Sequence, residues 1–368
     1  MTTNAFDDTD LRSVVGPSEA FDLGSAATPR LQALQHHLVL EVVAHLQDAA
    51  VPFVFRGGTA LHTKLARRTR FSIDADLTTS DPAAVANALK SFVDRFPRSE
   101  TTLEVPPENL KVDGVRHTLR FGRVDTSDGK GVRVMVEVVK AEGSATEPLR
   151  LVVDGMDWAR TVNAPTLDAF VGQKLAVLGL NTIGKRIGLA GDGSSRPRQT
   201  VCKQIFDLRQ LLHESLDFSN VTNAYVAAVA EGNALRGKRY TIQECLADAS
   251  ALLAELKGPR SGNKAEPLRY DLWAGFMQSK PWFPAKGRWD DTDYRIAAGV
   301  LTRLVECLQS GEGPTSMEQL RAPLLADIPQ QTRDKLANAL RVQEEWCSVE
   351  DFDLELRLAW AWAPRHYW

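Results

Sequence analysis

The chain has few of the features that stabilise a small secreted protein or hold a protein in a membrane. Its four cysteines (Cys202, Cys245, Cys307 and Cys347) are widely spaced and form no CxxC pair, which argues against a disulfide framework or a zinc site. No run approaches about 18 consecutive apolar residues, so no membrane-spanning helix is expected. The first residues, MTTNAFDDTD, lack the basic and apolar regions of a secretory signal. A cytoplasmic protein with reduced thiols is therefore predicted.

The sequence also lacks an excess of positive charge. Lysine and arginine total 44 residues against 47 aspartates and glutamates, which leaves a net charge of −3 at pH 7. This balance excludes a protein that binds nucleic acid through a globally basic surface. It does not exclude a local basic groove, because electrostatic steering depends on where charges cluster. Hydrophobic residues at 43% and charged residues at 25% are typical of a globular protein.

Four regions of the 368 residues differ in their patterns. Residues 1–29 are polar and are predicted to form a flexible tail. Residues 30–157 alternate between strand and helix patterns, and residues 158–258 are mostly helical. Residues 259–368 contain seven of the eight tryptophans and are mainly helical. A bilobed α+β protein is predicted, with a small mixed sheet in the first lobe, a helical second lobe and a mainly helical C-terminal extension.

A short strand, a Gly-Gly turn and a helix open the first lobe. Residues 51–58 form the strand and turn, and residues 59–68 form the helix, with Thr59 as its N-cap. Residues 71–80 alternate as a strand, so its two acids lie on one face. The other expected elements are helices at 30–50, 81–96 (capped by Asp81), 166–180, 199–216, 217–257 (two), 291–310 and 317–345, a hairpin of 115–124 with 131–141, and strands at 149–155 and 352–362.

Three acids in this lobe are candidates for binding a metal. Asp74 and Asp76 lie two residues apart on one strand, so their carboxylates point the same way and can share a divalent cation. Glu137 is a third candidate, because it lies on the face of its strand opposite a row of valines. Gly57 and Gly58 allow the backbone to approach a phosphate closely, and the helix that follows attracts anions at its N-terminus.

The two glycines and the two aspartates belong to the first two of four motifs in the chain. The four motifs are Arg56-Gly57-Gly58-Thr59, Arg70-Phe71-Ser72-Ile73-Asp74-Ala75-Asp76, Gln173-Lys174-Leu175-Ala176-Val177-Leu178 and Lys203-Gln204-Ile205-Phe206-Asp207-Leu208-Arg209-Gln210-Leu211. In order and type they resemble the motifs of the polymerase-β-like nucleotidyltransferases, and more narrowly those of the AbiEii/MenT family of nucleotidyltransferase toxins. The motif-bearing stretch runs from about residue 51 to residue 213. Gln204 departs from the family pattern, which usually has an acid there, and Arg56 stands where lysine is common.

The resemblance implies a nucleotidyltransferase fold, with residues 30–157 as the catalytic lobe and residues 158–258 carrying the Lys174 and Asp207 motifs. It implies transfer of a nucleoside monophosphate from an NTP to an acceptor hydroxyl, with release of pyrophosphate. In the MenT relatives the acceptor is the 3′ end of tRNA. The implied partners are therefore tRNA and a cognate antitoxin protein, with neither a membrane nor DNA.

The same resemblance implies a role for each charged motif residue. Asp74 and Asp76 would hold Mg²⁺ (or Mn²⁺) that bridges the triphosphate. Glu137 would complete a second metal position and help to deprotonate the attacking hydroxyl. Lys174 would neutralise charge on the triphosphate, and Asp207 would orient that lysine or the nucleotide.

The remaining motif residues are implied to bind the nucleotide. Gly57, Gly58 and Thr59 would cradle the β- and γ-phosphates, and Arg70 and Ser72 would complete the nucleotide site. In this family the hydroxyl two residues before the first aspartate can be phosphorylated by the antitoxin. Ser72 occupies that position, so it is also a candidate regulatory site.

Several basic residues outside the acidic motifs are candidates for RNA contact: Arg67, Arg68, Lys185, Arg186, Arg196, Arg198 and Lys203. Residues 179–186 nearly match a P-loop, but Arg186 replaces the hydroxyl that would hold Mg²⁺ and the preceding residues are helical. His36 and His37 are expected to be partly exposed and inert. Two alternative functions stay open, namely transfer of the nucleoside monophosphate to a protein side chain and a catalytically silent module that binds RNA or protein.

Overall fold

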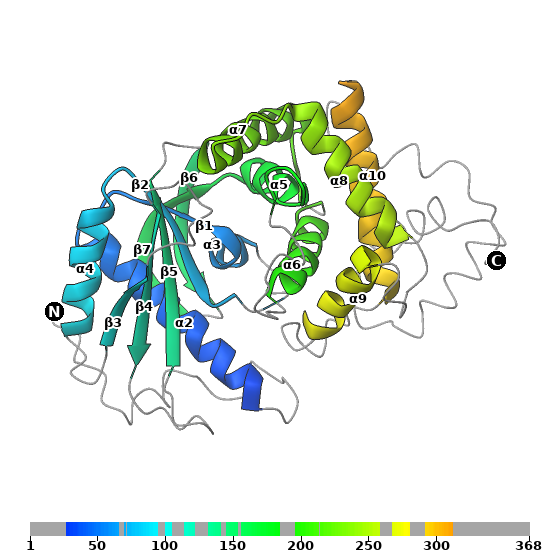
Figure 1. The fold of residues 1–368 in the computed structure, drawn as a ribbon. Helices are drawn as coiled ribbons and strands as arrows, with labels where there is room; N and C mark the ends of the chain where they lie inside the picture. The colour runs from blue at the N-terminus through cyan, green and yellow to red at the C-terminus, as the bar shows by residue number, and fades with distance from the viewer. Residues whose placement is uncertain are drawn as a thin grey trace. The chain divides into compact units, whose positions relative to one another are not determined.

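The computed structural model describes residues 27–65, 70, 72–94, 100–104, 114–121, 132–140, 145–153, 156–184, 196–212, 214–257, 267–279 and 291–311. The chain divides into two compact units (Figure 1). The first comprises Met1–Thr166 with Pro281–Ala285, and the second Leu167–Lys280 with Lys286–Trp368. Each unit has its own set of buried apolar side chains.

The first unit is built on a mixed sheet whose described strands follow the order β3-β4-β5-β2-β1-β7-β6. β2 is parallel to β5 and β1 is parallel to β7, whereas the other neighbouring pairs are antiparallel. The elements in chain order are α2 (Ala27–Asp48), β1 (Val54–Arg56), α3 (Gly57–Lys64), β2 (Asp74–Thr79), α4 (Pro82–Asp94), β3 (Glu100–Glu104), β4 (Gly114–Phe121), β5 (Val132–Lys140), β6 (Thr146–Val153) and β7 (Met156–Pro165). The predicted α+β class with a mixed sheet is confirmed.

One face of this sheet forms the core of the first unit. Val134, Val136 and Val138 of β5 are buried, as are Ala75 and Leu77 of β2. The residues between them on each strand point to the opposite face, because successive side chains of a strand alternate. α2 and α4 pack against each other and against the sheet (Figure 1). The acids of β2 and β5 therefore lie on the face of the sheet opposite the buried valines.

Local hydrogen bonds define the start of α4 and the end of α2. The carboxylate of Asp81 accepts a hydrogen bond from the backbone N–H of Ala84 (3.0 Å), which caps α4. α2 ends in a turn where Ala50 has a left-handed φ of 53°. In this turn the N–H of Val51 donates to the carbonyl of Leu46 (3.1 Å).

α3 begins two residues earlier than expected. Its N-cap is Arg56, so Thr59 lies inside the first turn and the expected N-cap role of Thr59 is wrong. Gly57 has a φ of 78°, a conformation that glycine adopts without steric cost, and it lets the chain pass directly from β1 into the helix. β2 begins at Asp74, three residues later than expected.

The expected strands β4, β5 and β6 are present, and β4 pairs with β5 as the predicted hairpin. β3 and β7 were not expected. β7 alternates apolar residues at Met156, Trp158, Val162 and Ala164, but Arg160 interrupts the series. The Arg160 guanidinium pairs with Asp48 of α2, which explains a charged residue on that side of the strand.

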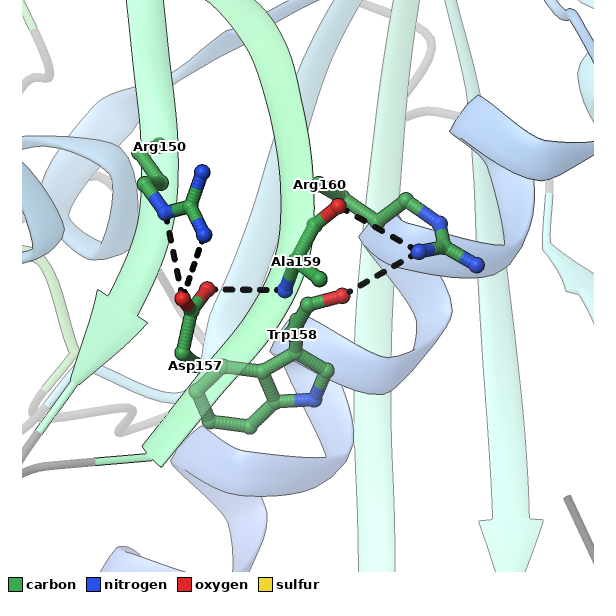
Figure 2. Close-up of polar contacts among 5 residues, drawn as sticks. All are labelled: Arg150, Asp157, Trp158, Ala159 and Arg160. Atoms are coloured by element: carbon green, nitrogen blue, oxygen red, sulfur yellow. Dashed lines mark hydrogen bonds and ion pairs between the residues drawn. The ribbon is translucent and has the colours of Figure 1, made fainter.

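The β6–β7 hairpin contains an irregular register held by polar contacts (Figure 2). The pairing of the two strands shifts between Arg150 and Val152. Asp157 accepts hydrogen bonds from the Arg150 guanidinium (2.5 Å) and from the backbone N–H of Ala159 (2.7 Å). Ala159 has a φ of 51°, so the aspartate stabilises a backbone conformation that residues other than glycine rarely adopt.

The regular elements of the second unit are all helices within the residues that are described. They are α5 (Leu167–Ala176), α6 (Arg196–Leu211), α7 (Phe218–Arg236), α8 (Ile242–Lys257), α9 (Pro267–Ser279) and α10 (Asp291–Ser310). α5 packs on α7, α6 on α9, and α8 on α10. Asp217 caps α7 by accepting from two backbone N–H groups, and Gly237 ends it with a left-handed φ.

An aromatic cluster fills part of this helical core. Trp273, Phe276 and Tyr294 contact one another at ring-centroid distances of 5.1 to 5.6 Å and are almost completely buried. Trp273 is thus a core residue. No described helix is long and apolar enough to cross a membrane. Residues 1–26, the expected helix at 317–345 and the expected strand at 352–362 lie outside the described residues.

Candidate active site

Asp74, Asp76 and Glu137 occupy adjacent positions on one face of the sheet. Asp74 and Asp76 are both half-buried and alternate with buried residues of β2. Glu137 is the register partner of Asp76 on the parallel strand β5. Neighbouring strands are about 4.8 Å apart, so these two carboxylates start from adjacent backbone positions. This register puts Glu137 on the same face of the sheet as Asp74 and Asp76.

The Gly-Gly turn lies directly against these acids. A Cβ on Gly57 would be 1.8 Å from Oδ2 of Asp76, and a Cβ on Gly58 would be 2.6 Å from the Ser72 hydroxyl oxygen. The same Cβ on Gly58 would be 2.8 Å from Nη2 of the Arg70 guanidinium. Only glycine fits at these two places, because any side chain would displace a polar group of the candidate site.

Two side chains hold the backbone at the start of β2. The Thr59 hydroxyl donates to the carbonyl oxygen of Asp74 (2.6 Å), and Nδ1 of His36 is 2.8 Å from the carbonyl oxygen of Ser72. Thr59 has no exposed surface, and His36 and His37 are 2% and 4% exposed. The expectation that these two histidines are partly exposed is therefore wrong. Their sequence pattern is helical and gives no sign of the tertiary contact with Ser72.

Arg56 completes this side of the sheet and was not expected among the site residues. It is the register partner of Asp76 on β1, and its Nη1 donates to the Thr78 hydroxyl (3.0 Å). Asp76 therefore lies between a strand that carries an arginine and a strand that carries Glu137.

The second unit contains a buried ion pair formed by two of the motif residues. Nζ of Lys174 on α5 is 2.6 Å from Oδ2 of Asp207 on α6, and the two side chains are 6% and 0% exposed. Lys174 also donates to Oε1 of Gln204 (3.2 Å). Gln204, which departs from the family pattern, thus serves as a neutral second acceptor for the lysine.

Most of the basic residues proposed to contact RNA lie outside the described residues. Arg67, Arg68, Lys185 and Arg186 are in this group. The backbone of Arg196 and Arg198 forms the first turn of α6, and Lys203 is half-buried on the same helix. Their proposed contact with RNA stays a prediction.

The near-P-loop segment is a closed turn. The N–H groups of Asn181 and Thr182 donate to Oδ2 of Asp248 (2.7 and 2.8 Å), and the N–H of Gly184 donates to the carbonyl of Gly179 (2.6 Å). Arg236 donates to the carbonyls of Thr182 and Gly184. The backbone groups that would cradle a phosphate in a P-loop are thus bound within the protein.

The acids of β2 and β5 have the chemistry of a magnesium or manganese site. Carboxylate oxygens are the ligands that these hard cations prefer. Within the described residues, however, no three histidine, cysteine, aspartate or glutamate side chains are grouped as they would be around an ion. Asp74, Asp76 and Glu137 therefore fit a divalent cation by type and by position on the sheet, and ligation would require their side chains to turn toward a common point.

The first unit thus has a Gly-Gly turn beside paired aspartates on a central strand of a mixed sheet, and the family that the chain matches is one of nucleotidyltransferases. The family model described as nucleotidyl transferase AbiEii toxin, type IV toxin-antitoxin system, matches residues 40–283, which is well over half of the chain. The chain belongs to this family, and membership implies an antitoxin partner. The crystal structure of an H. pylori protein described as a nucleotidyltransferase is similar to 66% of this chain and 96% of that chain, with 16% identity and a TM-score of 0.29. No curated protein matches the chain significantly.

Proposed function

We propose that this protein is a metal-dependent toxin that transfers a nucleoside monophosphate from an NTP to the 3′ end of tRNA and releases pyrophosphate. The observation that carries the proposal is the register of β2 with β5, which aligns Asp76 with Glu137 and leaves Asp74 on the same face. The family supplies the nucleotidyl transfer and the toxin role. The divalent cation and the tRNA acceptor belong to the proposal.

In this proposal the acids of the sheet perform the chemistry. Asp74 and Asp76 hold Mg²⁺ or Mn²⁺, which supplies charge neutralisation for an in-line displacement at the α-phosphate. Glu137 accepts the proton of the attacking hydroxyl. The oxygen of that hydroxyl forms the new bond to the α-phosphorus as the bond to the pyrophosphate oxygen breaks.

Other residues bind and orient the nucleotide. The backbone N–H groups at Gly57 and Gly58 meet the β- and γ-phosphates, because the first N–H groups of a helix have no partners within the helix. Arg70 and Ser72 lie against Gly58 and complete this binding surface. For Lys174 the family resemblance implies a role in neutralising charge on the triphosphate, and its ion pair with Asp207 fixes the position of its ammonium group.

The antitoxin is proposed to regulate the site at Ser72. The Ser72 hydroxyl lies where a Gly58 side chain would be, next to the Arg70 guanidinium. A phosphate on Ser72 would add roughly two negative charges at this point. It would compete with the triphosphate for Arg70, so a phosphorylated chain is expected to lose its affinity for NTP.

The test incubates the purified chain with total tRNA, Mg²⁺ and each α-labelled NTP in turn. The comparison is with the double variant Asp74→Asn, Asp76→Asn, which keeps the side-chain size but removes the metal-binding charge. Asp94→Asn, at an exposed acid on α4, is the matched control. Label in tRNA with the wild type and the control, and none with the double variant, is expected.

Other outcomes would contradict the proposal in defined ways. Label that resists RNase and is lost with protease would indicate transfer to a protein side chain. Label in tRNA that persists in the double variant would refute the metal site. Binding of tRNA without any transfer, and without dependence on Mg²⁺, would indicate a silent binding module.

A further inference from the structure

The first turn of α3 contacts both aspartates of β2, each in a different manner. Gly57 lies against the carboxylate of Asp76. Thr59, two residues later, donates its hydroxyl proton to the main-chain oxygen of Asp74 at 2.6 Å. The helix therefore touches the side chain of one acid and the backbone of the other.

The register of the sheet explains why Asp74 needs this contact. β1 ends at Arg56, which lies opposite Asp76. In the described part of the chain, no β1 residue therefore lies opposite Asp74, because the chain has already turned into α3. Beyond Arg56 the chain continues as α3, and the Thr59 hydroxyl of this helix supplies a donor for the Asp74 carbonyl.

The Thr59 hydroxyl is poorly suited to bind a phosphate. A threonine hydroxyl has one proton to donate, and here that proton is directed to the Asp74 carbonyl. The side chain also has no exposed surface, so a nucleotide in solution does not reach it. The Thr59 hydroxyl is therefore committed to Asp74.

We infer that Thr59 is a positioning residue whose hydroxyl fixes the backbone of Asp74, and with it the direction of the Asp74 carboxylate toward a divalent cation. The inference rests on the proposed function, since it assumes that Asp74 binds the metal. A carboxylate whose backbone is free to shift binds a cation less tightly, because binding must then supply the ordering. The Thr59 hydroxyl thus raises the affinity for the metal and does not itself bind the triphosphate.

Three variants separate the hydroxyl from its surroundings. Thr59→Val replaces the hydroxyl with a methyl group of similar size, and Thr59→Ser keeps the hydroxyl. The control is Thr63→Val on the same helix, because the Thr63 hydroxyl donates within the helix, to the carbonyl of Thr59 (2.9 Å). Circular dichroism establishes that each variant is folded before binding is measured. Thr59→Ser carries the test should Thr59→Val fail to fold, since the inference requires it to bind metal as the wild type does.

The first readout is the dissociation constant of Mn²⁺ for the full chain, measured by electron paramagnetic resonance without nucleotide or acceptor. Asp74→Asn defines the value for a disabled site. Thr59→Val is expected to weaken Mn²⁺ binding by about tenfold or more, as loss of a group that orients a metal ligand does. Thr59→Ser and Thr63→Val are expected to stay within about threefold of the wild type.

The second readout is nucleotidyl transfer as a function of Mg²⁺ and of NTP. Thr59→Val is expected to need more Mg²⁺ for half-maximal rate, and to show an unchanged KM for NTP once Mg²⁺ is saturating. A raised KM at saturating Mg²⁺, with unchanged Mn²⁺ affinity, would overturn the inference and make the hydroxyl a phosphate ligand. A lowered melting temperature with Mn²⁺ affinity and both kinetic constants unchanged would also overturn it, in favour of a purely structural role.

Failure of the proposed function has a different signature. If the wild type binds Mn²⁺ in a manner that depends on Asp74 but transfers nothing, the proposed reaction fails, and the Mn²⁺ affinities of the Thr59 variants still decide the inference. If Asp74→Asn binds Mn²⁺ as the wild type does, Asp74 is not a metal ligand and the inference is overturned together with the metal site.

Discussion

Removing one partner of the buried ion pair Lys174–Asp207 is expected to destabilise the protein strongly. The two charged atoms are 2.6 Å apart, and their side chains are 6% and 0% exposed. At an effective dielectric constant of about 20, their attraction is about 6 kcal/mol, which is offset by a desolvation cost of several kcal/mol for each ion. The net value of the intact pair is therefore small. Loss of one partner leaves the other buried and uncompensated, which costs about 3–5 kcal/mol.

Two variants test this reasoning. Asp207→Asn removes the carboxylate from Lys174 and keeps the neutral acceptor Oε1 of Gln204 at 3.2 Å. This variant is expected to lose about 3 kcal/mol of unfolding free energy, the lower end of the range for breaking a buried pair. The double variant Lys174→Met, Asp207→Leu replaces the pair with apolar groups of similar size. It is expected to lie within about 1 kcal/mol of the wild type or to be more stable.

The assay is urea unfolding of the full chain followed by circular dichroism. The matched control is Glu306→Gln, which breaks the Arg303–Glu306 pair. That pair has the same 2.6 Å distance but its side chains are 54% and 46% exposed. Its loss is expected to cost at most about 1 kcal/mol. An Asp207→Asn cost below about 1 kcal/mol, or a double variant as unstable as the single one, would refute the reasoning.

The same variants separate stability from chemistry. If the double variant is more stable than Asp207→Asn but transfers no nucleotide, the ion pair is needed for function and not for stability. If it regains stability and retains transfer, the pair is a structural feature and the proposed role of Lys174 on the triphosphate is wrong. Transfer is measured with α-labelled NTP under identical conditions for both proteins.

Three further predictions concern the first unit. Gly57→Ala is expected to cost about 1–2 kcal/mol in unfolding free energy and to abolish transfer, because its φ is 78° and the new Cβ would meet the Asp76 carboxylate; unchanged transfer would contradict the site. Burial raises the pKa of Glu41 above its ordinary value of 4.5. Ionisation of Glu41 therefore lowers the free energy of unfolding as the pH rises above 4.5. Glu41→Gln, which can still accept from Trp158, should raise the melting temperature more as the pH rises above 4.5, and a pH-independent effect would refute this. Ala50→Gly should stabilise the protein by about 1 kcal/mol in urea unfolding, since the backbone is left-handed there, and a loss of stability would contradict it.

The strand that carries the acids could be predicted because its local pattern agrees with its final environment. Ala75 and Leu77 are buried while Asp74 and Asp76 face the other side, as strict alternation requires. The strand β7 was not predicted because Arg160 stands on the side that the apolar residues of β7 share. Its charge is satisfied by Asp48, which lies 112 residues earlier in the chain. A local pattern contains no information about such a distant partner.

The position of Thr59 illustrates the same limit at the site. A threonine after two glycines, at the start of a helical pattern, is typical of an N-cap. The helix instead starts at Gly57, because that residue accepts a positive φ, and Thr59 moves into the first turn where it meets Asp74. His36 is similar, since its contact with Ser72 depends on how α2 packs against the sheet. The motif resemblance predicted the candidate residues, while the contacts that each of them makes depend on the tertiary structure.

The Gly57-Gly58 turn and the turn at residues 179–184 differ in what their backbone groups can still bind. In the turn at residues 179–184, the carboxylate of Asp248 accepts from successive backbone N–H groups, and Arg236 donates to the carbonyls. A phosphate would have to displace a half-buried carboxylate that already makes charge-assisted hydrogen bonds. At Gly57 and Gly58 the chain enters α3, whose first N–H groups have no acceptor within the helix. Since Thr59 directs its hydroxyl to Asp74, the backbone of this turn is the part that remains for a triphosphate, and it lies directly beside the acids that would hold the metal.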